Sequence, residues 1–209
     1  MSKADKSESI KPVSKANNAA TPKPRVRDRI FDTACELFYQ QGIRCVGVDT
    51  IASEAGTNKM SFYRNFPSKD DLISAYLGKQ AAEFWEWWEN AIAAYPDNPR
   101  RQIEALFEAQ AAKVCDHNRH GCAFMNAAVE LRQTDHEAIS IIHDNKTEMR
   151  RRLRKLAREA GARTPDLLGD ALTLIAEGNA MARLSFDTAE WPGAQSPKIV
   201  KKLLQAYID

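Results

Sequence analysis

The sequence predicts an all-α protein with an N-terminal helix-turn-helix domain and a larger helical domain after it. Apolar residues recur every three or four positions along most of the chain, and glycine or proline separates these periodic segments. No stretch shows the period of two that is typical of a half-buried strand. With 209 residues, 44% of them hydrophobic, the chain can bury a substantial core. We therefore expect about nine helices.

Residues 1–24 differ in composition from the rest of the chain. They contain mainly Lys, Ser, Ala, Asn and Pro, so burial of apolar side chains cannot offset the entropy lost on ordering. We expect a disordered tail here. A helix-turn-helix domain is expected over residues 25–72, and a second helical domain over residues 73–209.

The charge balance limits the function classes open to the chain. Thirty basic and 28 acidic residues give a formal net charge of +2, which argues against nucleic-acid binding through bulk positive charge but permits a local patch. The four cysteines form no Cys-x-x-Cys pair, no run approaches the roughly 18 apolar residues of a membrane span, and no secretory signal is visible. We expect a reduced, cytoplasmic protein without a membrane partner.

Three helices are expected in the first domain. Apolar residues from Ile30 to Phe38 recur every three or four positions, and Gly42 follows where a helix C-cap belongs. Gly56 separates two shorter segments, and Pro67 ends the second one because proline cannot continue a helix. The expected helices cover residues 25–41, 48–55 and 58–66.

Longer helices are expected in the second domain. Ser68, with Asp71 three residues later, resembles a capping box in which Asp replaces the usual Glu. It opens a helix that we expect to continue to Tyr95, where Pro96 ends it. Further helices are separated by glycine, threonine and proline breaks. They are expected over residues 99–117, 122–132, 135–160, 165–186 and 197–208.

The two short helices around Gly56 have the features of a unit that reads DNA. Gly56 can adopt the positive φ of a sharp turn, and Asn58 is a good N-cap for the second helix. The start of that helix is where major-groove readers contact bases. From Gly56 to Lys69 the sequence has three cations and no carboxylate, together with neutral hydrogen-bonding groups for phosphates or base edges. Phe62 and Phe66 are expected in the core.

The segment from Tyr63 to Lys69 has the pattern Tyr-x-x-Phe-x-x-Lys. The preceding residues contain the pairs Gly42-Ile43, Ile51-Ala52 and Ala55-Gly56. Together these motifs closely resemble the DNA-binding domain of the TetR family of transcriptional regulators, over residues 25–72. The resemblance implies a homodimer that binds double-stranded DNA at a palindromic operator, most simply a repressor that a small-molecule inducer releases.

The resemblance also implies roles for individual residues. Tyr63 would place its hydroxyl on a phosphate, and Lys69 would contact the DNA backbone. Lys59, Met60 and Ser61 would face base edges, although Met60 could equally fill space. The complete predicted DNA-binding set is Asp49, Thr50, Thr57, Asn58, Lys59, Met60, Ser61, Tyr63, Arg64, Asn65 and Lys69.

One pair of residues departs from the family pattern. Val46-Gly47 stands where many members have Thr-Thr or Thr-Ser, so the usual hydroxyl cap of the second helix is absent. Either Asp49 does part of this capping, or the helix starts differently.

A second basic segment carries more positive charge than the helix-turn-helix. Its cations are Lys146, Arg150, Arg151, Arg152, Arg154, Lys155 and Arg158. They lie on one long predicted helix beside a modest apolar face formed by Leu153, Leu156 and Ala157. We interpret them as a solvated helix face, and a second nucleic-acid surface is the alternative.

The last two helices have apolar stripes suited to a subunit interface. Small residues on the first of them, flanked by Leu174 and Met181, permit close backbone approach, and Ile199 begins a matching apolar face on the final helix. Periodicity alone also fits a closed monomer core, but the resemblance implies dimerisation here. The predicted interface set is Ala171, Ile175, Gly178, Ala182, Leu203, Leu204 and Tyr207.

The resemblance further implies that the middle helices hold the inducer. Large aromatic side chains suit an apolar ligand of small to moderate size, which Asn126 or His143 could orient. Ordinary core packing is the alternative for each aromatic residue. The predicted lining set is Trp85, Trp88, Phe107, Phe124, Met125, Asn126 and His143.

Cys115, His117, His120 and Cys122 suggest two further hypotheses. These side chains are closer in sequence than the ligand pairs of a closed zinc site, so we predict no metal. Cys115 and Cys122 could instead sense oxidants or electrophiles, which requires an exposed thiolate. An accessory DNA-binding protein without ligand control is another alternative. The common phosphate-loop, serine-hydrolase and zinc-protease motifs are absent, so we expect neither an enzyme nor a cofactor.

Overall fold

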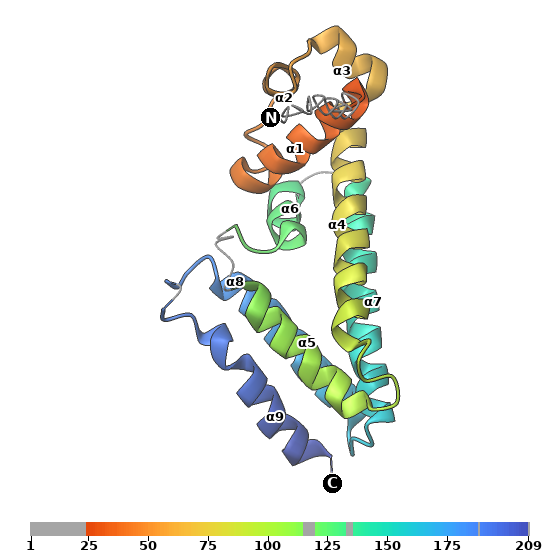
Figure 1. The fold of residues 1–209 in the computed structure, drawn as a ribbon, viewed down its shortest axis with the longest axis vertical. Coiled ribbons are helices and arrows are strands. Elements are labelled where there is room, and N and C mark those ends of the chain that lie inside the picture. The colour runs from red at the N-terminus through yellow and green to blue at the C-terminus, as the bar shows by residue number, and fades with distance from the viewer. Residues whose placement is uncertain (1–23, 115–119, 133–135, 188, 209) are drawn as a thin grey trace, which may run out of the picture.

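The chain forms an elongated helical protein with the N-terminal helices at one end and α9 at the other (Figure 1). A computed structural model describes residues 24–114, 120–132, 136–187 and 189–208. In these ranges all regular structure is helical, which confirms the predicted fold class. The helices are α1 (Val26–Gln41), α2 (Val48–Glu54), α3 (Lys59–Asn65), α4 (Lys69–Ile92), α5 (Pro99–Val114), α6 (Ala123–Leu131), α7 (Ala138–Glu159), α8 (Pro165–Ala182), the 3-10 helix η1 (Pro192–Gln195) and α9 (Ser196–Tyr207).

Local sequence signals fix several helix ends where they were predicted. Asn58 accepts a hydrogen bond from the backbone N–H of Ser61 at 2.9 Å, so it caps α3. Ser68 accepts one from the backbone N–H of Asp71 at 3.0 Å and caps α4. Gly42 ends α1 with a φ of +87°. These caps set the angles at which α3 and α4 begin.

The helix α2 begins without a side-chain cap. Gly47 occupies its N-cap position, and no side chain accepts a hydrogen bond from the first turn. Asp49 lies in that first turn, where its negative charge interacts favourably with the positive end of the helix dipole. Of the two alternatives left open by the sequence, the first holds in part. Asp49 stabilises the start of α2 through its charge, although it is not the N-cap residue.

Two clusters of buried side chains divide the interior. The first joins α1, α2 and α3 to the beginning of α4, to α6 and to the beginning of α7. The second joins the end of α4 to α5, the rest of α7, α8 and α9. Phe84 packs against both clusters. The predicted boundary after residue 72 therefore falls within α4, and α6 shares a core with the helix-turn-helix domain.

The segment between α8 and α9 differs from the prediction. The helix predicted over residues 165–186 ends at Ala182, and η1 precedes α9. Trp191 is 4% exposed, and its Nε1 donates to the Asn179 carbonyl at 3.2 Å. A Cβ on Gly193 would lie 2.0 Å from this ring, so a larger residue cannot replace the glycine without a shift. Burial of this tryptophan turns the chain before the last helix.

The helices in the described part of the chain differ from membrane spans in length or polarity. None of them combines the length and the apolar composition needed to cross a bilayer.

Candidate nucleic-acid interface

The core of the helix-turn-helix holds α3 through three apolar side chains. Phe62 is fully buried, as is Ile51 on α2, and Phe66 is 2% exposed. The rings of Phe62 and Phe66 lie 6.1 Å apart between centroids. Gly56, at a φ of +63°, makes the sharp turn between the two helices. This packing fixes the opposite face of α3 outward, and both phenylalanines are core residues as predicted.

The outward face of α3 exposes the side chains expected to read DNA. Met60 is 68% exposed and Tyr63 is 47% exposed, which is unusual for large apolar or aromatic residues. Lys59 and Arg64 on the same helix are exposed, and α3 contains no acidic residue. Together these groups form a protruding surface with two cations, a phenol and a flexible thioether.

Lys59 forms an ion pair across the turn. Its Nζ lies 3.1 Å from Asp49 Oδ2, and the side chains are 55% and 75% exposed. The hydrogen bond to Asp49 and the charge of that carboxylate raise the pKa of Lys59 above its ordinary value. Because both groups are solvated, such a pair contributes little to stability and can exchange partners readily. Asp49 therefore orients Lys59 at the start of α3.

Lys69 makes contacts inside the domain in addition to the role that the resemblance implies. Its Nζ donates to the Ile43 carbonyl at 2.6 Å and lies 5.8 Å from the centre of the Phe38 ring. Burial lowers the pKa of this ammonium. The ammonium thus holds the segment between α1 and α2 in place, and the contact of Lys69 with a phosphate stays a prediction.

Two amides of the predicted set are also used inside the domain. Asn58 caps α3, and the Asn65 Nδ2 donates to the Ser61 carbonyl one turn earlier at 2.8 Å. Asn58 remains exposed, and Asn65 and Ser61 are partly buried. Outside α3, Thr50 is exposed on α2 and Thr57 is partly exposed in the turn, so both hydroxyls of the predicted set reach solvent.

The fold and the matched domain agree with one family. The model of the bacterial regulatory proteins of the tetR family matches residues 30–76, which span α1, α2, α3 and the start of α4. The crystal structure of SCO4454, a TetR-family transcriptional regulator from Streptomyces coelicolor, superposes with a TM-score of 0.82 at 26% identity, covering 88% of this chain and 96% of that one. The chain therefore contains a domain of the tetR family and has the fold of a TetR-family regulator.

Curated relatives of the TetR family match shorter stretches. The transcriptional activator FasR from Mycolicibacterium smegmatis is 30% identical over 90 residues, which are 42% of this chain and 41% of that protein. The transcriptional repressor KstR2 from Mycobacterium tuberculosis is 25% identical over 131 residues, 60% of this chain and 61% of that protein. The chain thus spans about half the length of these two relatives. Both of these relatives are transcription regulators.

The basic segment on α7 differs from α3 because each of its seven cations has a carboxylate partner, whereas on α3 only Lys59 has one in the described part of the chain. The pairs are Lys146 with Glu177, Arg150 and Arg154 with Asp170, Arg151 and Arg152 with Glu148, Lys155 with Glu159, and Arg158 with Asp166. Hydrogen bonds from Arg151 and Arg152 lower the pKa of Glu148 to about 2. Arg150 and Arg154 likewise hold the pKa of Asp170 well below its usual range. The geometry fits the solvated, paired helix face that we preferred.

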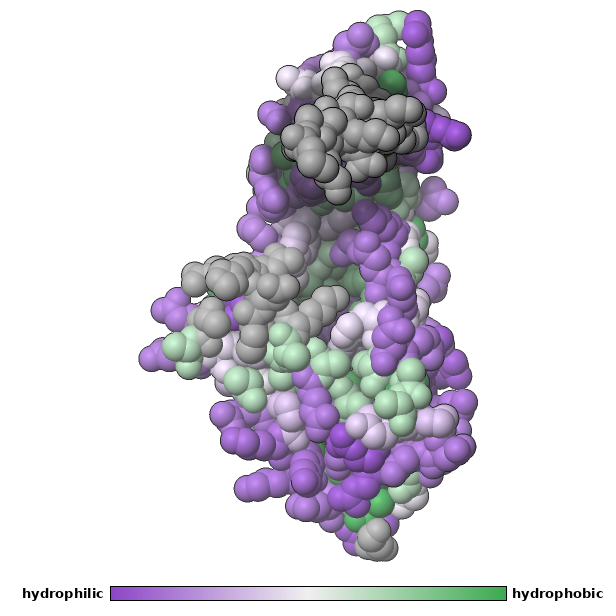
Figure 2. All heavy atoms as spheres, in the orientation of Figure 1, coloured by the Kyte–Doolittle hydropathy of each residue, from purple (hydrophilic) through white to green (hydrophobic). Residues whose placement is uncertain are grey.

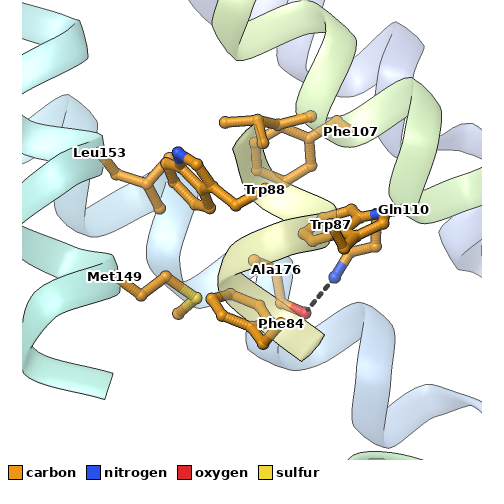
Figure 3. A pocket seen from close by; sticks show the side chains of 9 residues that line it. Phe84, Trp87, Trp88, Phe107, Gln110, Met149, Leu153 and Ala176 are labelled. Atoms are coloured by element: carbon orange, nitrogen blue, oxygen red, sulfur yellow. Dashed lines mark hydrogen bonds between the residues drawn. The ribbon is translucent and has the colours of Figure 1, made fainter. Parts of the chain in front are cut away.

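The TetR-type core contains a small apolar cavity. It holds about 30 Å³, roughly the share of one water molecule in the liquid. Its nine lining residues are Phe84, Trp87, Trp88, Leu106, Phe107, Gln110, Met149, Leu153 and Ala176 (Figure 3). Trp88 and Phe107 belong to the predicted lining set. The other members come from α4, α5, α7 and α8, where the sequence offered many apolar residues and no means of choosing among them.

The remaining predicted lining residues lie elsewhere. The Trp85 ring lies under the Arg152 guanidinium, with 4.2 Å between the carbon of that group and the ring centre. Phe124 packs in the first cluster, and His143 is exposed on α7, so the expectation for His143 is wrong. Met125 is partly buried on α6, and the Asn126 Nδ2 donates to the His120 carbonyl at 2.6 Å. Helical periodicity could not separate the two clusters that these residues join.

Only some residues of the predicted subunit interface are exposed and can contact a second subunit. Leu204 is fully buried in the second cluster, so it stabilises the monomer and cannot reach a partner. Ile175, Leu203 and Tyr207 pack partly against the same cluster. Gly178 is exposed, and Ala171 and Ala182 are partly buried. Apolar side chains on α8 and α9 that remain exposed are Leu167 at 58%, Leu174 at 72%, Met181 at 36% and Ile199 at 50%.

Of the cysteines and histidines suggested as a cluster, the structure describes His120 and Cys122. Cys122 is partly buried at the start of α6, and the Lys146 Nζ lies 3.7 Å from its Sγ. Cys115 and His117 lie outside the described residues. Among the residues that are described, no group of three or more His, Cys, Asp or Glu side chains is arranged to hold a metal.

The space-filling view adds the distribution of polar and apolar surface over one face of the protein. Hydrophilic residues cover most of this face, and hydrophobic residues gather in smaller patches between them (Figure 2).

Proposed function

We propose that the chain is a cytoplasmic, sequence-specific DNA-binding regulator that acts as a homodimer. The observation that carries this proposal is the exposed face of α3, where Lys59, Met60, Tyr63 and Arg64 project from a capped helix that lacks acidic residues. A helix presented in this way fits the major groove, with its N-terminal residues at the base edges. Phosphate contacts from Tyr63 and Arg64 would set its register.

The exposed stripe on α8 supports a symmetric dimer. Leu167, Ala171, Leu174, Gly178 and Met181 alternate at intervals of four and three residues, the spacing at which two helices pack along a shared seam. A contiguous apolar stripe with the central leucine 72% exposed is a usual mark of a covered surface. A two-fold axis along this stripe would give the dimer two copies of α3, as a palindromic operator requires.

We further propose that the regulator is a repressor released by a small, largely apolar ligand. Three contacts connect the helix-turn-helix domain to the ligand-binding helices. The Arg44 backbone N–H donates to Glu130 Oε2 at 2.7 Å, and the Tyr39 hydroxyl donates to the Gly121 carbonyl at 2.9 Å. Asp70 lies 3.3 Å from the His136 Nε2. A ligand that moved α6 would therefore move the elements that hold α3, and it would favour the conformer that binds DNA poorly.

Selection of binding sites from random DNA tests the core of the proposal. The native chain is expected to enrich a palindrome whose half-sites are about 34 Å apart or a multiple of this distance. Leu174→Glu places charge in the proposed seam and is expected to give a folded monomer by light scattering, with reduced affinity for the palindrome. Enrichment of no sequence, or an unchanged dimer in this variant, would contradict the proposal.

Covalent sensing is the alternative to a non-covalent ligand. The Lys146 ammonium, 3.7 Å from the Cys122 sulfur, is the observation that favours it, because reactive cysteines commonly lie beside cationic groups. The response would then require Cys122 together with Cys115. Release from the selected DNA by hydrogen peroxide or diamide that persists in Cys122→Ser would exclude this alternative.

A further inference from the structure

Asn145 is a buried polar side chain for which the described part of the chain provides no hydrogen bond. It is 4% exposed, and neither its Oδ1 nor its Nδ2 has a partner there. The other buried residues on this face of α7 are apolar: Ala138, Ile142, Met149, Leu153 and Leu156. A buried amide with no partner is costly, so its presence calls for a group that completes it.

The helix register places Asn145 next to the apolar cavity, on the side toward α4. Asn145 lies one turn before Met149, which lines the cavity, and seven residues before Arg152, whose guanidinium covers Trp85 on α4. The helices α4 and α7 run side by side in Figure 1, and Arg152 reaches Glu89 at their far end. Asn145 therefore faces the middle of α4, close to the turn that contains Phe84.

Phe84 separates the cavity from a larger groove. The groove holds about 480 Å³ and is lined by residues of α1, α4 and α6, among them Tyr39 and Phe124. Phe84 lines both hollows and packs against both core clusters. In Figure 3 its ring lies beside Met149. A rotation of this one side chain would join the two hollows.

The lysines near the two hollows are already paired. Lys79 in the groove lies 3.8 Å from Glu83 and 3.9 Å from Asp32. Lys146, on the neighbouring turn of α7, pairs with Glu177 at 2.7 Å. The polar residue of the cavity lining, Gln110, donates to the Ala176 carbonyl at 3.0 Å and accepts from the Asn179 amide at 2.9 Å. These pairings leave the Asn145 amide as the available recognition group for an uncharged ligand.

We propose that Asn145 is the hydrogen-bonding anchor of the effector site and that the effector is a neutral amphiphile. Once Phe84 has moved toward the groove, the apolar end of the effector occupies the cavity beside Trp88 together with the space that Phe84 leaves, and the uncharged polar head pairs with the Asn145 amide. This inference rests on the proposed ligand-controlled function. Because the groove also touches α1, an occupant that displaces Phe84 acts directly on the domain that carries α3.

A matched series of six-carbon probes tests the anchor on the full chain without DNA. Hexanamide provides a neutral donor and acceptor, hexanoate a charge, and 1-chlorohexane an apolar end. Binding is followed by tryptophan fluorescence, because Trp87 and Trp88 line the cavity. The variants are Asn145→Leu, the near-isosteric Asn145→Asp, and the exposed control Asn90→Leu, with folding checked by circular dichroism.

The native chain and Asn90→Leu are expected to bind hexanamide more tightly than hexanoate. Asn145→Leu is expected to weaken hexanamide binding about 10-fold, the usual effect of removing one buried hydrogen bond, while 1-chlorohexane binds as well or better. Asn145→Asp is expected to weaken hexanamide binding too, which keeps the test open if the leucine variant does not fold. Absence of hexanamide binding by the native chain, or an equal weakening of both neutral probes in the variants, overturns the proposal. Failure of the native chain to select any DNA sequence would instead reject the proposed function.

Discussion

Two basic helices of this protein differ in how their charges are used. The helix α7 has five arginines and two lysines between residues 146 and 158, and each of them has a carboxylate within 4.0 Å. The helix α3 has only Lys59 and Arg64, and its one ion pair among the described residues lies at the solvated rim of the domain. The larger charge on α7 pairs within the helix and with α4 and α8, whereas the smaller charge on α3 faces outward.

The comparison shows that the number of cations in a segment does not give the number that remain unpaired. A phosphate competes with a protein carboxylate for the same guanidinium or ammonium, so a paired cation gains less from DNA than a free one does. Arg150 and Arg154 share Asp170 through four hydrogen bonds of 2.6 to 2.8 Å. Arg64 on α3 has no such partner among the described residues.

The largest expected effect is the loss of DNA affinity when a side chain that contacts bases is removed. Lys59→Ala should lower affinity for the selected DNA site by about 10- to 100-fold and relax base preference at one position of each half-site. Lys155→Ala on α7 is the matched control, because its side chain is 62% exposed and also carries one ion pair. Fluorescence anisotropy with site variants measures both quantities. An equal loss of DNA affinity in the two variants would contradict the proposal that α3, and not α7, contacts DNA.

The next largest expected effect is a loss of stability when a methyl group is added at the contact between α7 and α8. A Cβ on Gly169 would lie 2.6 Å from the Cα of Arg154 and 2.8 Å from its backbone nitrogen. Gly169→Ala should therefore force the two helices apart and lower the free energy of unfolding by about 2 kcal/mol. Urea denaturation measures this change. An unchanged midpoint would show that α7 is not held as closely to α8 as its ion pairs require.

The pH dependence of stability should report on the two carboxylates that pair with the arginines of α7. Arginine partners depress the folded-state pKa of Glu148 and Asp170, so their stabilising effect is complete above the unfolded values near 4 and declines as the pH falls toward 2. Glu148→Gln with Asp170→Asn should be less stable than the native chain at pH 6, and the gap in melting temperature should narrow from pH 5 to pH 3. A gap that stays constant over this range would contradict the assignment.

The smallest expected effect on stability is that of a substitution at Gly178, the other glycine of α8. A Cβ on Gly178 would meet nothing within 4 Å, so Gly178→Ala should leave the monomer fold intact or raise its stability by about 0.5–1 kcal/mol. In the proposed dimer the added methyl group would lie in the seam and raise the dimer dissociation constant. Sedimentation at a series of concentrations, combined with thermal unfolding of the dilute protein, separates the two effects. Unchanged dimerisation would place the seam elsewhere.

Local rules predicted much of the fold from the sequence. The caps formed by Asn58 and Ser68 and the turn at Gly56 depend on neighbouring residues, so spacing was enough to find them. The same holds for the breaks at proline. The orientation of Lys69 was not predictable in this way, because the carbonyl that its ammonium binds belongs to a residue 26 positions earlier.

Tertiary packing decided the features that the sequence left open. The last helix has two apolar rows of similar spacing, and contact with the second cluster buries Leu204 while Ile199 stays 50% exposed. His143 and Asn145 are both polar residues on α7, two positions apart, yet one faces solvent and the other the core. The row Ala138, Ile142, Asn145, Met149 and Leu153 was a signal for Asn145, because it is the one polar residue at that spacing.

The salt dependence of DNA affinity tests most directly whether α3 and not α7 meets the phosphates. Lys59→Ala with Arg64→Ala removes two charges from α3, and Arg151→Ala with Lys155→Ala removes two exposed charges from α7, so the double variants have the same net charge. We expect the plot of log affinity against log salt to become shallower in the α3 variant, by about 0.9 for each phosphate that is no longer neutralised, and to keep its native slope in the α7 variant. An equal change of slope in both variants, or a change in the α7 variant alone, would contradict this account.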